Sequence, residues 1–67
     1  MNNEHLIGPP LEDDGSMPAS WVIQEKSTGR AIFETFNGDL YRTIKPAYEM
    51  IPIRKYLMAV NAKIAAQ

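Results

Sequence analysis

Residues 21–36, WVIQEKSTGRAIFETF, predict a β-hairpin. The two runs 21–26 and 30–36 are rich in the β-branched and aromatic residues that favour strands. Between them, Ser27-Thr28-Gly29 is typical of a three-residue loop with Gly29 in the left-handed conformation. We therefore expect the rest of the chain to fold around this hairpin.

The length of the turn decides which side chains share a face of the sheet. A three-residue loop pairs Lys26 with Arg30, Ile23 with Phe33 and Trp21 with Thr35. One face then carries Trp21, Ile23, Ala31 and Phe33, and the other carries Val22, Gln24, Ile32, Glu34 and Phe36. A four-residue loop would pair Glu25 with Arg30 but divide the large apolar residues between the faces. We expect the first register, because burial outweighs an exposed ion pair of under about 1 kcal/mol.

Residues 37–51 predict a short helix and then a third strand. Asn37-Gly38-Asp39 ends the second strand, and Asp39 suits the N-cap of a helix whose apolar side is Leu40, Tyr41 and Ile44. Pro46 ends that helix by the preceding residue. Residues 47–51, AYEMI, predict a strand that pairs antiparallel with the first one, the commoner arrangement in small sheets. The expected spatial order of the strands is 2-1-3.

Residues 52–67 predict one amphipathic helix. Pro52 suits its first turn, and apolar residues recur at spacings of three and four: Ile53, Tyr56, Leu57, Val60 and Ile64. We expect this helix to lie across the face that carries Trp21, Ile23 and Phe33. The predicted fold class is α+β, with a small three-stranded antiparallel sheet in a β-β-α-β-α order and the C-terminal helix packed on one face.

The N-terminal residues 1–20 differ in composition from the rest. They are rich in Pro, Gly and acidic residues, which predicts a disordered tail before a single domain of residues 21–67. Leu6, Ile7 and Leu11 flank the prolines, and the alternative is that they form a short docking motif for a partner. The tail carries four acidic and no basic residues, a net −4, and residues 21–67 carry seven basic and four acidic residues, a net +3. This asymmetry is typical of soluble proteins in general, and the alternative is a nucleic-acid surface screened by its own tail.

A chain of 67 residues has a marginal core, and self-association is one way to bury more area. The absence of cysteine excludes disulfides and agrees with a reducing compartment. His5 is the one histidine, so neither a metal site nor a cofactor is predicted. The sequence shows no secretory signal and no apolar run long enough for a membrane span. We expect a soluble, cytoplasmic protein without a membrane partner.

The residues that catalysis would need are not gathered in any recognisable pattern. The carboxylates of residues 21–67 are Glu25, Glu34, Asp39 and Glu49, all at positions typical of solvated strands or caps. No Ser-His-Asp arrangement and no glycine-rich phosphate loop is present. We therefore predict no catalytic, cofactor-binding or metal-binding residues and no small-molecule substrate.

Two surfaces are candidates for binding. The second face of the sheet carries Val22, Ile32 and Phe36, which predict a protein interface or a homodimer unless the short helix covers them. Lys26, Arg30, Arg54 and Lys55 are candidate nucleic-acid contacts. Residues 26–30, KSTGR, resemble the turn of the DNA-binding arms of phage-type integrases, which implies a weak accessory DNA-binding module as the alternative function.

Residues 21–61 resemble a group of small proteins of enterobacterial phages and prophages. The resemblance rests on Trp21-Val22, Ser27-Thr28-Gly29, Glu34-Thr35-Phe36-Asn37, Tyr48-Glu49, Pro52-Ile53, Tyr56-Leu57 and Asn61. It implies an origin in a mobile element and a phage or host partner. Together with the two surfaces, it leads us to expect a non-catalytic interaction protein that binds protein and self-associates.

Overall fold

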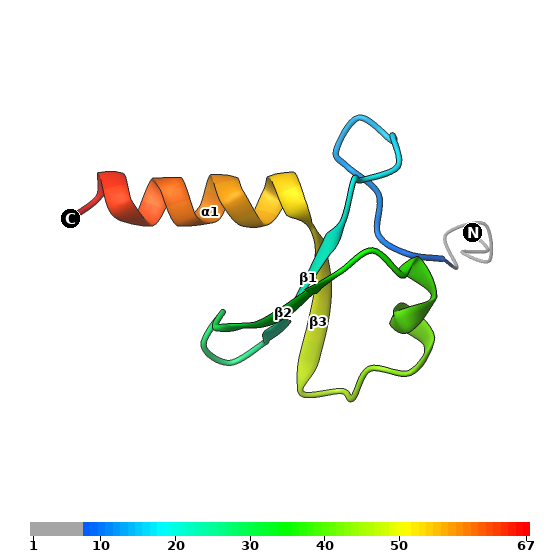
Figure 1. Cartoon of the computed structure of the whole chain (residues 1–67). Coiled ribbons are helices and arrows are strands. Elements are labelled where there is room, and N and C mark those ends of the chain that lie inside the picture. The colour runs from blue at the N-terminus through cyan, green and yellow to red at the C-terminus, as the bar shows by residue number, and fades with distance from the viewer. Residues whose placement is uncertain (1–7) are drawn as a thin grey trace, which may run out of the picture.

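The computed structural model describes residues 8–67. Within this range the elements are β1 (Trp21–Glu25), β2 (Ala31–Thr35), a 3-10 helix (Gly38–Arg42), β3 (Tyr48–Pro52) and α1 (Ile53–Ala65) (Figure 1). The strands form one antiparallel sheet in the order β2-β1-β3. The small α+β class and the predicted strand order are confirmed. The segment between β2 and β3 is a 3-10 helix, so the predicted β-β-α-β-α order is met only in part.

The hairpin combines the two registers that the sequence offers. Trp21 pairs with Thr35 and Ile23 with Phe33, as the three-residue loop predicts. The register then shifts at a β-bulge, so that Gln24 pairs with Ala31 and Ile32 is the extra residue on β2. Beyond the bulge the turn has four residues, and Glu25 lies opposite Arg30. Ala31 therefore shares the face of Gln24, which corrects its predicted place beside Trp21 and Ile23.

One face of the sheet carries the core. Trp21, Ile23 and Met50 are buried together, and Leu40, Tyr41, Ile44 and Tyr48 pack against them. The chain has to cross from the end of β2 to the start of β3, and it places the 3-10 helix on this face as it does so. Asn37, rather than the predicted Asp39, caps that helix: its side-chain oxygen accepts a hydrogen bond from the Asp39 backbone N–H at 3.1 Å.

Helix α1 lies on the opposite side of the sheet from the 3-10 helix (Figure 1). Gln24, which alternates with the core residue Ile23, borders one cavity together with α1 residues. This corrects the prediction that the C-terminal helix covers the Trp21, Ile23 and Phe33 face. The connection before β3 already fills that face. Moreover, α1 begins directly where β3 ends, with Pro52 as its N-cap, so no linker allows the helix to cross over.

Pro9, Pro10 and Ser20 of the N-terminal segment contact the folded domain, and the disorder predicted for residues 1–20 as a whole stays a prediction. The Trp21 indole N–H donates a hydrogen bond to the Pro10 carbonyl at 2.8 Å. Pro9 and the Trp21 ring approach Gly38 so closely that a Cβ there would lie 3.1 Å from each. Proline rings pack on an aromatic surface at a low cost in chain entropy, which explains how this segment is held. The predictions about His5, Leu6 and Ile7 concern residues outside the described range.

Candidate functional site

Exposed apolar residues occur along and just beyond strand β2. We call Ile32, Phe33 and Phe36 the β2 surface; their exposed fractions are 41 %, 47 % and 78 %. Two of the three predicted interface residues, Ile32 and Phe36, are thus accessible. The third, Val22, is 4 % exposed, because it sits on central strand β1 on the side that α1 occupies. Phe33 was expected in the core, but β2 is an edge strand and leaves half of its ring open.

The hairpin turn carries the predicted basic residues Lys26 and Arg30. The Gly29 N–H donates to the Glu25 carbonyl at 2.8 Å, with Gly29 at φ +74°. Arg30 Nε lies 3.4 Å from Glu25 Oε1, and the Thr28 hydroxyl donates to the same oxygen at 2.8 Å. Because this ion pair is largely solvated, it stabilises the turn by under about 1 kcal/mol. It also reduces the positive charge that Arg30 offers to a phosphate.

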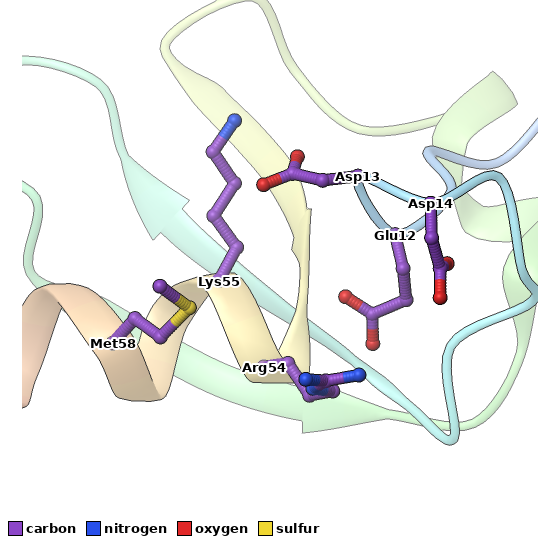
Figure 2. A pocket seen from close by; sticks show the side chains of 6 residues that line it. All are labelled: Glu12, Asp13, Asp14, Arg54, Lys55 and Met58. Atoms are coloured by element: carbon purple, nitrogen blue, oxygen red, sulfur yellow. The ribbon is translucent and has the colours of Figure 1, made fainter.

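The other two predicted basic residues face an acidic loop. Arg54 and Lys55, in the first turn of α1, border a cavity of about 140 Å³ with Met58 and the loop residues Glu12, Asp13 and Asp14. Figure 2 shows the acidic side chains on the N-terminal loop and the basic ones on the helix, around the same space. The first turn of α1 has no acidic residue of its own, although negative charge is favourable there. The loop supplies this charge from elsewhere in the chain.

The surroundings of Asp14 lower the pKa of its carboxyl group. Asp14 Oδ1 accepts hydrogen bonds from the Ser16 hydroxyl at 2.6 Å and from the Ser16 backbone N–H at 2.9 Å. These bonds, with a smaller contribution from the charge of Arg54, hold the pKa of Asp14 below its ordinary value. Asp14 therefore stays ionised to a lower pH than an ordinary aspartate does.

The four predicted nucleic-acid contacts fall into two separate groups. Lys26 follows β1, and its N–H donates to the Ala47 carbonyl just before β3 at 3.0 Å. Arg54 follows the opposite end of β3, where Pro52 pairs with Trp21. The length of β1, about 13 Å, lies between the groups. No single basic surface unites the four residues.

Sequence reasoning missed that α1 presents its apolar residues to solvent. None of its residues is buried, and Leu57, Met58 and Ile64 are 49 %, 65 % and 61 % exposed. We call Leu57, Ile64 and the half-buried Val60 the α1 stripe. A helix of 13 residues is about 20 Å long, whereas the outer strands of a three-stranded sheet lie about 10 Å apart. This mismatch in length, readable from the sequence, indicates that the sheet cannot cover the whole helix.

A second cavity lies between α1 and the hairpin turn. It also has a volume of about 140 Å³ and is lined by Gln24, Gly29, Tyr56, Ala59, Val60 and Lys63. Lys63, which was not among the predicted site residues, therefore lies near the turn that carries Lys26 and Arg30. The cavity also adjoins Val60 of the α1 stripe.

Glu34 and Glu49 make separate structural contacts. Glu34 accepts a hydrogen bond from the buried Ser20 hydroxyl at 2.5 Å, and Glu49 accepts one from Gln24 on the neighbouring strand at 2.7 Å. Over residues 8–67, no group of three or more His, Cys, Asp or Glu side chains is placed to hold a metal ion. Over the same residues, neither helix length nor apolar character suffices for crossing a membrane.

Comparison with protein-family models, with curated proteins and with solved structures gave no match to this chain. The resemblance of residues 21–61 to small phage and prophage proteins therefore stays a prediction.

Proposed function

We propose that this chain is a small non-catalytic interaction protein that binds protein, including a second copy of itself. The observation that carries the proposal is the apolar β2 surface on an edge strand. Among residues 8–67, eight large hydrophobic side chains are exposed, whereas four hydrophobic residues form the buried core. Exposed apolar patches on small domains mark interaction sites. In this proposal the partner is a phage or host protein and the setting is the cytoplasm, with which the absence of cysteine agrees.

The geometry of β2 supports both modes of binding. Among residues 8–67, β2 pairs with β1 alone, so its outer edge has backbone N–H and C=O groups without a sheet partner in that range, and such an edge can accept a further strand. Glu34, the one charged residue of β2, is held by Ser20 of the same domain. A strand added at this edge, from a second copy or from a partner, would bury apolar area without opposing an unpaired carboxylate.

Sedimentation velocity over a range of protein concentrations tests this assignment. We expect Ile32→Ser with Phe36→Ser to raise the dissociation constant of self-association at least about tenfold, a loss of about 1.4 kcal/mol. Leu57→Ser with Ile64→Ser is the matched control, because it removes similar exposed apolar area from α1. Unchanged association of the β2 variant, or equal loss in both variants, would refute the β2 assignment.

A second candidate function is weak DNA binding. The observation in its favour is that Lys63 of α1 borders the same cavity as Gly29, so it adds a third basic side chain near Lys26 and Arg30. A hairpin turn with basic residues can contact phosphates or enter a major groove.

Titration of a labelled DNA duplex, followed by fluorescence anisotropy, decides this candidate. We expect affinity that falls steeply as salt rises and that drops on Lys26→Glu. Lys45→Glu changes the same charge on an exposed residue outside the turn and serves as the control. Absence of binding at low salt, or equal loss in both variants, would exclude the turn as a DNA contact.

A further inference from the structure

We infer that α1 is a second docking surface and that its partner is an acidic, amphipathic protein segment. This surface belongs to a different element from the β2 surface, and the inference does not depend on the role of β2. It rests on the apolar stripe of α1, on the sign of its charges, and on the acidic loop beside its first turn.

The α1 stripe has the spacing that one helix uses to pack against another. Leu57, Val60 and Ile64 are separated by three and four residues, so they lie along one side of the helix. Leu57 and Ile64 are about half exposed or more, while Val60 borders the cavity beside the hairpin turn. The stripe thus continues into a hollow of about 140 Å³, which can receive an apolar side chain of a partner.

The charges of α1 indicate the sign of the charge that a partner should carry. Arg54, Lys55 and Lys63 are its charged residues, and residues 53–65 contain no acidic side chain. In a parallel pair of α1 helices from two copies, Lys63 would face Lys63, which disfavours that arrangement. A partner with acidic residues beside an apolar stripe is complementary in both respects.

The chain already contains an example of this complementarity. Glu12, Asp13 and Asp14 line the first cavity together with Arg54 and Lys55 (Figure 2). The loop reaches only the first turns of α1, and Leu57 and Ile64 stay exposed. An acidic segment that lay along the helix beyond this loop would make the same kind of contact with Lys63 and would also cover the stripe.

The alternative occupant of a basic amphipathic helix is an anionic membrane surface. The shape of the site favours protein: the hairpin turn and α1 together bound a hollow beside Val60. A flat bilayer surface fits such a concave site less well than a side chain does.

The test uses the full chain and a labelled synthetic peptide of leucine, alanine and glutamate, with leucines at helical spacings of three and four. A length of about 14 residues matches α1. The control peptide replaces glutamate by lysine and keeps every leucine. We expect the acidic peptide to bind, by fluorescence anisotropy, at least about tenfold more tightly than the basic one.

Substitutions in α1 and at the β2 surface show which part of the chain the peptide contacts. Leu57→Ser with Ile64→Ser should weaken the acidic peptide at least about tenfold, and Lys63→Glu should weaken it about threefold or more. Phe36→Ser, which removes exposed apolar area at the β2 surface, should leave peptide affinity unchanged. Since Leu57, Ile64 and Lys63 are exposed, we expect these variants to remain folded, which amide NMR spectra will show.

Three results would overturn the inference: equal affinity for both peptides, equal loss in the α1 and Phe36 variants, or binding to phosphatidylglycerol vesicles with none to the acidic peptide. Loss of self-association in the β2 variant with peptide binding intact would support both proposals separately. Peptide binding without self-association would leave this inference standing and refute the role of β2 in self-association.

Discussion

The 3-10 helix and α1 relate to the same sheet in opposite ways. The 3-10 helix has five residues, yet its Leu40 and Tyr41 pack against the buried cluster of Trp21, Ile23 and Met50. Neither helix contains a buried residue, but the thirteen residues of α1 include the exposed Leu57, Met58 and Ile64. Helix length and helical propensity therefore say little about which segment stabilises the fold. The difference is that the short segment packs against the buried cluster, whereas several apolar residues of the long one are open to solvent.

The largest effect should follow from damage to the face under the 3-10 helix. Ile23 is 1 % exposed, so Ile23→Ala should lower the free energy of unfolding by about 2–5 kcal/mol. Because a domain of this size has only about 3–5 kcal/mol in total, much of this variant should be unfolded. Urea unfolding followed by tryptophan fluorescence measures the change. A loss under about 1 kcal/mol would show that the cluster is not the main source of stability.

A direct comparison of the two helices uses one substitution in each. Leu40→Ala in the 3-10 helix should cost about 1–2 kcal/mol, because Leu40 packs against the core but is only partly buried. Leu57→Ala in α1 should change the free energy of unfolding by about 0.5 kcal/mol or less. Urea midpoints of the two variants give the answer. Equal losses would mean that α1 contributes to the core as much as the 3-10 helix does.

Hydrogen exchange of backbone amides sharpens the comparison within α1. The end of the helix, residues 61–65, is exposed throughout and lacks support from the sheet, whereas β1 is hydrogen-bonded on both sides. We expect these amides to exchange at least about tenfold faster than those of β1. NMR-detected exchange measures both in one experiment. Equal protection would show that the whole helix unfolds only with the domain.

The smallest effect concerns the acidic loop and pH. Because the pKa of Asp14 is lowered in the folded protein, its carboxylate contributes stability that is complete above the unfolded pKa and is lost as pH falls through the folded pKa. We therefore expect Asp14→Asn to lower the Tm slightly near neutral pH and to have no effect at about pH 2. Thermal unfolding at both values tests this, and Asp13→Asn is the control. An equal Tm difference at both pH values would contradict a role for ionised Asp14.

The sequence allowed prediction of the elements that depend on local pattern. The pairings of Trp21 with Thr35 and Ile23 with Phe33 followed from the apolar alternation of the two strands, and the antiparallel place of β3 followed from topology. The bulge at Ile32 could not be predicted from the sequence pattern. The pattern offers a three-residue or a four-residue turn as alternatives, whereas the bulge combines the strand pairing of the first with the turn length of the second. Burial of apolar residues favours one register and charge pairing favours the other, and the bulged backbone satisfies both requirements.

The prediction of the sites failed where tertiary packing decides exposure. Val22 and Phe33 were assigned from strand alternation alone, but a central strand buries its residues on both faces and an edge strand does not. Arg54 borders the same cavity as the acidic loop. The segment before β1 contacts distant parts of the chain, since the Pro10 carbonyl accepts a hydrogen bond from Trp21 and Pro9 lies close to Gly38, and composition does not reveal such contacts. The candidate nucleic-acid residues were separated for a similar reason, since the sheet places the hairpin turn and the start of α1 at opposite ends of β1.

The direct junction between β3 and α1 has a consequence for recognition. Pro52 ends the strand, Ile53 begins the helix, and the Ile53 N–H donates to the Ser20 carbonyl at 2.9 Å. The helix therefore has no hinge at its base, and its direction is set before any partner arrives. A partner that binds such a preorganised arm spends less free energy on ordering it. Insertion of two glycines after Pro52 would keep every side chain of α1 and remove this advantage.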